Sequence, residues 1–112
     1  MNKESVLENI SIYSGGDSTM TNELIDLIKT AVNEAAIELA SFNVANNQAA
    51  IAALAHKLRI SMSLIGEETV LNQAILLDES VATHTELALV ESTFTAFKTS
   101  LNEIKTIMKD LP

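Results

Sequence analysis

The residue best suited to chemistry in this sequence is His56, which lies in an amphipathic stretch that we expect to be helical. On a helical wheel of about 100° per residue, the apolar side chains of this stretch gather on one side. His56 lies about 140° from the centre of that side, so its ring is predicted to point away from a helical core. An exposed neutral imidazole is a nucleophile that a partner protein can reach. The apolar side is formed by Ile51, Leu54, Leu58, Met62 and Ile65, with Ala55 alongside.

The surface predicted around His56 consists of small and apolar side chains. One and two turns away lie Ala49, Ala52, Ile60 and Ser63, whereas a solvated helix face usually carries charged residues. Short side chains let another protein approach the ring, and apolar area is buried when that protein docks. Two interpretations remain open from these residues: a docking surface around a functional histidine, or an ordinary surface histidine on a face that pairs subunits.

Two basic residues flank the histidine in the sequence, Lys57 and Arg59. Arg59 follows His56 by three positions, about one helical turn, where its guanidinium can contact a phosphate on the ring. Lys57 is predicted to support the same site. The candidate site is therefore a nucleophilic ring with a cation beside it.

The elements that must position this site are predicted to be helices. The 112 residues fit one domain, and 47% of them are apolar, while only three Gly and one Pro interrupt the chain. This composition favours an all-α fold. Apolar spacing and turn signals predict helices over residues 3–11, about 18–42, about 48–65 and about 67–78. A last helix opens with the capping-box spacing of residues 83–86. Short connections between long helices imply an antiparallel four-helix bundle with a short additional N-terminal helix.

The predicted core positions follow from the same spacing. In the second helix they are Met20, Leu24, Ile28, Ala31, Ala35, Leu39 and Phe42. In the last helix they are Leu87, Val90, Phe94, Phe97, Leu101, Ile104 and Met108.

Charge and composition exclude several classes of function. The net charge is −8, and the seven Lys and Arg residues form no cluster, which argues against binding to nucleic acid or to anionic membranes. There is no Cys, so disulfides and thiolate chemistry are excluded. No stretch approaches the roughly 20 apolar residues of a membrane-spanning helix, and the N-terminus has no signal core. We expect a cytoplasmic domain without a bound metal or cofactor.

The segment Ala55-His56-Lys57-Leu58-Arg59-Ile60-Ser61, followed by Leu64-Ile65-Gly66, resembles the phospho-acceptor motif of histidine-phosphotransfer domains. That motif reads Ala-His-x-Leu-Lys-Gly-Ser, with a Gly ten residues after the His. The upstream Tyr13-Ser14-Gly15-Gly16-Asp17 is similar to the family's entry into its second helix. The resemblance extends over essentially the whole chain, so residues 1–112 are identified as a single histidine-phosphotransfer domain.

The resemblance implies a phosphorelay intermediate. His56 would accept a phosphoryl group from a receiver-domain aspartate and pass it to another receiver, with Arg59 stabilising the phosphate. The partners would be response-regulator receivers and a hybrid sensor histidine kinase, which the same chain could include. Magnesium would be bound by the receiver. The domain would be a monomeric carrier rather than an enzyme, because the sequence has no Gly-rich phosphate loop or ATP lysine motif.

Two positions depart from the family pattern. Ile60 replaces a frequent Gly one turn after the His, and its bulk either adds docking surface or obstructs transfer. Asp78 stands where members often carry a Gln that hydrogen-bonds the imidazole. A carboxylate there could accept the ring N–H and fix the tautomer, or it could be a plain acid at the end of a helix. The alternative functions are a receiver-binding bundle, or an oligomerising one, that transfers no phosphoryl group.

Overall fold

The computed structural model describes residues 2–83 and 86–111. The described residues form five helices and no strands, so the prediction of an all-α fold is confirmed. The helices are α1 (Lys3–Tyr13), α2 (Ser18–Ser41), α3 (Gln48–Ile65), α4 (Glu68–Ala82) and α5 (Leu87–Lys109). None of these helices combines the length and the apolar character needed to cross a membrane.

The helix ends are set by local side-chain chemistry. The Asp17 carboxylate accepts the backbone N–H of Met20 at 2.9 Å and so satisfies a donor at the start of α2. Gly66 ends α3 with φ of 73°, a left-handed conformation that suits glycine. The side chain of Asn9 in α1 donates to the carbonyl of Ile65 at 3.0 Å, which ties α1 to the end of α3.

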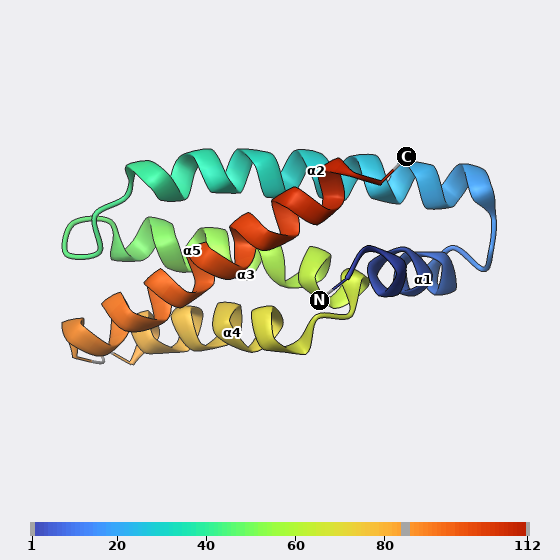
Figure 1. Cartoon of the computed structure of the whole chain (residues 1–112). Helices are drawn as coiled ribbons and strands as arrows, with labels where there is room; N and C mark the ends of the chain where they lie inside the picture. Colours follow the sequence, from blue (N-terminus) through green and yellow to red (C-terminus); the bar gives the residue numbers. More distant parts are fainter. Residues whose placement is uncertain (1, 84–85, 112) are drawn as a thin grey trace.

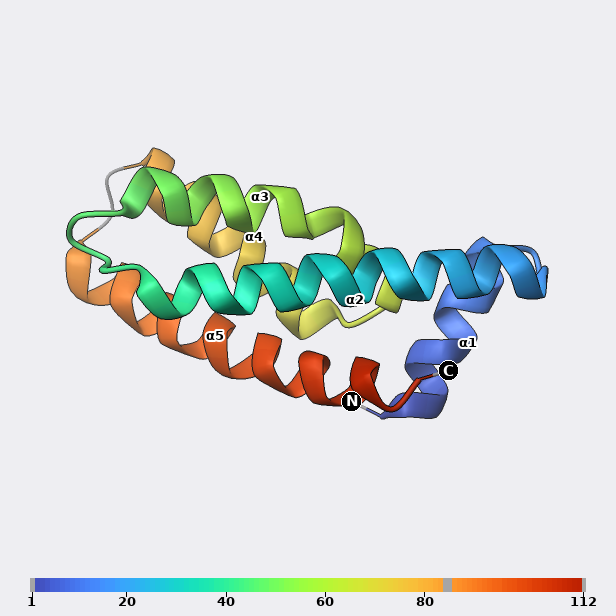
Figure 2. The same ribbon diagram turned by 90° about the horizontal axis from the view of Figure 1, so that it is seen from above.

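Helices α2 to α5 run along the long dimension of the molecule, and α1 packs against α2 and α3 at one end (Figures 1 and 2). Around the core, α3 packs on α4, α4 on α5 and α5 on α2. The contact between α2 and α3 is much less extensive than that between α3 and α4. One side of α3 is therefore closely covered, while the other side is left more open.

The buried residues confirm most of the predicted core and correct part of it. In α3, all predicted core positions are buried except Leu54, which is half-buried; in α5, all are buried except the exposed Leu87. In α2 the prediction was partly wrong, because Met20 is exposed while Ile25 and Val32 are buried. The buried face of α2 is Thr21, Ile25, Ile28, Val32, Ala35 and Leu39.

The physical reason for the α2 correction is the direction in which this helix packs. Its buried face is rotated by roughly 50° from the predicted one, at 100° per residue. The rotation turns α2 toward α5, its more extensive contact, and away from α3. Ala31 and Leu54, predicted as core, are half-buried: they pack against the core and also line a groove between α2 and α3.

The end of α4 also differs from the prediction. The helix continues to Ala82 rather than stopping near Asp78, and Thr83 caps its C-terminal end by donating its backbone N–H to the carbonyl of Glu79 at 2.9 Å. Helix α5 then begins at Leu87 with Glu86 at its N-cap. Thr83 therefore belongs to the end of α4, and Glu86 is the N-cap of α5 rather than its third residue, so the predicted capping box is wrong. Residues 84–85 lie outside the described residues.

Candidate functional site

His56 lies near the middle of α3 with 69% of its side chain exposed. The opposite side of the helix carries the buried Ile51, Ala55, Leu58, Met62 and Ile65. The ring therefore lies on the outer flank of α3, where the helical wheel placed it. Coverage of the opposite face holds the helix in place while the imidazole remains accessible.

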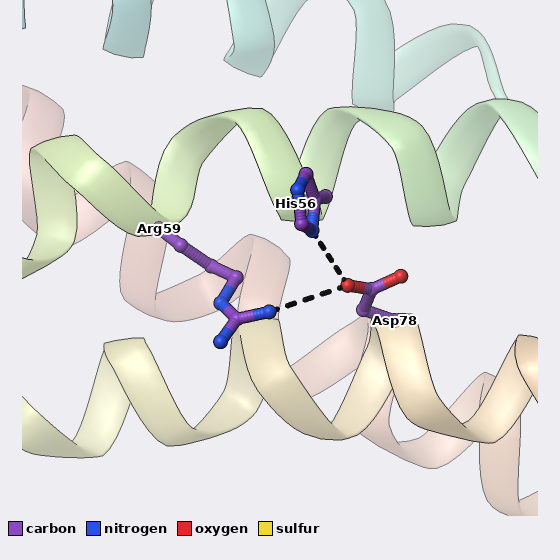
Figure 3. A network of polar contacts seen from close by, with 3 residues as sticks. All are labelled: His56, Arg59 and Asp78. Carbon is purple, nitrogen blue, oxygen red and sulfur yellow. Dashed lines mark hydrogen bonds and ion pairs between the residues drawn. The ribbon is translucent and has the colours of Figure 1, made fainter.

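Asp78 of α4 lies directly beside the ring. Its Oδ2 is 2.8 Å from Nδ1 of His56 (Figure 3). Because α4 continues to Ala82, Asp78 is inside the helix rather than at its end. The structure therefore contradicts the interpretation of Asp78 as a plain helix-end acid.

This contact distinguishes the two ring nitrogens. An ionised carboxylate has no proton to donate, so Nδ1 must be the donor in the bond between His56 and Asp78. In the neutral ring Nε2 then carries the free lone pair. The arrangement leaves the outer nitrogen of an exposed imidazole as its nucleophilic atom.

Arg59 completes a three-residue network. Its Nη1 is 3.4 Å from the same Oδ2 of Asp78 (Figure 3). The side chains of Arg59 and Asp78 are 39% and 29% exposed, so both are partly desolvated at the junction of α3 and α4. One carboxylate oxygen thus meets a ring N–H and a guanidinium, both from α3.

The predicted docking residues lie around this network as expected on the surface of α3. Ala49 and Ser63 are exposed, and Ala52 is half-buried. Ile60, one turn beyond His56, is 73% exposed. Short side chains and one large apolar side chain therefore surround the imidazole.

On its α2 side, α3 borders a groove with a volume of about 760 Å³. The apolar part of its lining includes Leu27, Ala31, Ala35, Leu54, Leu58 and Ile60. Sequence reasoning missed this groove because it assigned Ala31 and Leu54 to the core. A usable signal was present, since a row of acids follows the apolar side of α2 at successive intervals of three, eight and four residues: Glu23, Asp26, Glu34 and Glu38.

Lys57 is placed differently from Arg59. It is exposed and lines the groove between α2 and α3, whereas Arg59 contacts Asp78 of α4. Successive positions on a helix differ by about 100°, so Lys57 and Arg59 lie on opposite flanks of His56. The two predicted cations therefore occupy different environments, one among the acids of α2 and one within the network.

Among residues 2–83 and 86–111, no three His, Asp or Glu side chains are arranged to hold a metal ion. Comparison with known protein families, with curated proteins and with solved structures finds no match for this chain.

Proposed function

We propose that this chain is a histidine-phosphotransfer domain that accepts a phosphoryl group on Nε2 of His56 and passes it on. The observation that carries the proposal is the exposed ring whose Nδ1 contacts Asp78 at 2.8 Å. That geometry presents the Nε2 lone pair to a visiting protein. The resemblance of residues 55–66 to the phospho-acceptor motif supports the same function.

The transfer is a displacement at phosphorus. The Nε2 lone pair forms the N–P bond, while the P–O bond of a receiver's aspartyl phosphate breaks and its electrons return to the carboxylate. Phosphoryl transfer relies on positioning and charge stabilisation. In this proposal the receiver supplies Mg²⁺, and the chain supplies the oriented ring and the Arg59 cation. The reverse step delivers the group to a second receiver, and no ATP is used.

Docking of the receiver is assigned to the surface around the ring. Ile60 belongs both to this surface and to the lining of the α2–α3 groove, so the two form one continuous area. Ala49, Ala52 and Ser63 leave room beside the imidazole for the receiver's phosphorylated aspartate. Apolar area buried in the groove would hold the complex while the phosphoryl group moves.

The same proposal includes a finer description of the fold and its setting. Helices α2–α5 would be the antiparallel four-helix bundle of the family, with α1 as the short additional helix. The domain would act as a monomer in the cytoplasm, either alone or within a hybrid sensor histidine kinase. Its partners would be response-regulator receivers.

The direct test is transfer of labelled phosphate from a panel of phosphorylated receivers. We expect acid-labile, alkali-stable label on the wild-type chain and none on His56→Gln. The matched control is His84→Gln, which removes the chain's other histidine and should still accept label. Label retained by a folded His56→Gln variant would disprove the assignment.

A second candidate function is a domain that binds a receiver without accepting phosphate. The exposed bulk of Ile60 on the same face as His56 favours it, because the side chain could keep the receiver's aspartate from Nε2. Binding without label in the wild type, together with transfer by Ile60→Ala, would support this candidate over the first.

A further inference from the structure

The Asp78 carboxylate is shared by two donors from α3 at unequal distances. Its Oδ2 lies 2.8 Å from the His56 ring and 3.4 Å from the Arg59 guanidinium. The first distance is that of a strong charge-assisted hydrogen bond, while the second is at the long end of the range. The contact to Arg59 is therefore the weaker of the two and the easier to exchange.

Phosphorylation would change the charges around this carboxylate. In the unmodified site the imidazole, which must be neutral to act as a nucleophile, and the guanidinium face one carboxylate. When Nε2 bonds to phosphorus, the ring retains its Nδ1 proton and becomes positively charged, and a phosphoryl dianion appears on its outer side. The ring–Asp78 bond is then strengthened, while Arg59 gains a partner with more charge and more acceptor oxygens.

We propose that Asp78 is a positioning residue that holds the ring in its nucleophilic tautomer and releases Arg59 to the phosphoryl group as the N–P bond forms. This inference rests on the proposed function. Arg59 lies one turn from His56 on the same helix, so a change of side-chain rotamer can carry its guanidinium toward the ring. A carboxylate at residue 78, unlike an amide, also stabilises the positively charged phosphoimidazole.

The two partners of His56 should therefore have opposite effects on the phosphorylated state. When the N–P bond breaks, the ring leaves with its electron pair. A ring that keeps its Nδ1 proton leaves as neutral imidazole, which is a better leaving group than the anion. Asp78 retains that proton and so makes the phosphoryl group easier to transfer. Arg59 pairs with the phosphoryl oxygens and stabilises the loaded protein.

The first arm of the test measures the tautomer without any phosphorylation. Long-range ¹H–¹⁵N spectra at alkaline pH report which nitrogen of the His56 ring carries the proton. We expect the Nδ1–H form in the wild type, in Glu79→Ala (an exposed acid next to Asp78 as control) and in Asp78→Asn, whose amide oxygen still accepts. Asp78→Ala should shift the ring to the Nε2–H form. An unchanged tautomer in Asp78→Ala would overturn the inference.

The second arm measures the lifetime of phosphohistidine made with phosphoramidate, so that no receiver is needed. All variants carry His84→Gln to leave one histidine. Asp78→Asn should lengthen the half-life and Arg59→Ala shorten it, each by about fivefold, as for a partly exposed charged contact. Effects in the same direction, or no effect of Asp78→Asn, would overturn the inference. Failure of every receiver to label the wild type would count against the proposed function alone.

Discussion

The two flanks of His56 differ in what they present to a visiting protein. On the α4 side, α3 is closely packed, and the side chains of His56 and Arg59 contact one Asp78 carboxylate oxygen at 2.8 Å and 3.4 Å. On the α2 side, the helices are less extensively packed, and a groove of about 760 Å³ has an apolar lining and an acidic rim. In the proposed function, this one helix would separate two tasks: its α4 flank would orient the His56 ring, and its α2 flank would offer a docking surface.

The difference follows from where α2 packs. Because its buried face turns toward α5, residues such as Leu27 and Ala31 are left to line the groove. Helix α4 packs so extensively on α3 that the short Asp78 side chain reaches the ring. Changes on the groove side should therefore affect docking, and changes on the α4 side should affect chemistry.

The largest effect is expected from removing apolar area on the groove side. The variant Leu27→Gln/Ile60→Gln replaces two side chains that are 67% and 73% exposed, without changing charge or helix propensity greatly. If both are central contacts, affinity for the receiver should fall by about 2 kcal/mol or more, roughly thirtyfold. Titration calorimetry with a receiver measures this loss.

The control for this variant is Leu76→Gln on α4, an apolar side chain that is 52% exposed and lies outside the groove lining. It should bind the receiver as the wild type does. The half-life of phosphohistidine in Leu27→Gln/Ile60→Gln should also remain unchanged. If this variant instead shortened the phosphohistidine half-life and bound the receiver normally, the α2 flank would act on the reaction rather than on docking, and the proposed division of tasks would be wrong.

The next largest effect concerns the end of the helix that both flanks share. Gly66→Ala forces a left-handed backbone on Ala, which costs about 1–2 kcal/mol, and the added Cβ would collide with the Asn9 amide. Urea unfolding should show a loss of about 2 kcal/mol. The His56 tautomer in the folded protein should not change, because the substitution alters the end of α3 and not the contact between His56 and Asp78.

A double-mutant cycle sharpens this expectation. Asn9→Ala removes both the colliding amide and its hydrogen bond to the Ile65 carbonyl. The double variant Gly66→Ala/Asn9→Ala should therefore lose less stability than the sum of the two single changes. Strict additivity would mean that the backbone conformation alone accounts for the effect.

A smaller effect is expected from the acidic rim. Glu34→Gln/Glu38→Gln removes two negative charges beside the groove without altering its apolar lining. If the partner face is basic, association should slow by up to about tenfold at low salt, and the difference should vanish at high salt. Glu103→Gln, an exposed acid on α5 outside this lining, is the matched control. Faster association would indicate an acidic partner face.

The sequence predicted the residues on the α4 flank of α3 better than it predicted the groove on the α2 flank. The outward position of His56 follows from helical spacing within α3 alone, and the stop at Gly66 follows from its freedom to adopt positive φ. The contact with Asp78 depends on how far α4 continues and on its register against α3, neither of which local spacing determines. The groove depends on the rotation of α2 about its axis by roughly 50°, and this rotation is determined by packing against α5.

The smallest expected effect is on the stability of the fold when the Asp78 contacts on the α4 flank are altered. The Asp78 contacts are made by side chains that are 69% and 39% exposed, and such surface pairs contribute about 0.2–1 kcal/mol at most. Asp78→Asn should therefore unfold in urea within about 0.5 kcal/mol of the wild type. If its phosphohistidine half-life nevertheless changes about fivefold, the carboxylate acts on the reaction rather than on the fold. A larger loss of stability would instead make Asp78 a structural link between α3 and α4. The two flanks of α3 would then differ only in how closely the neighbouring helix packs, and not in their role in the reaction.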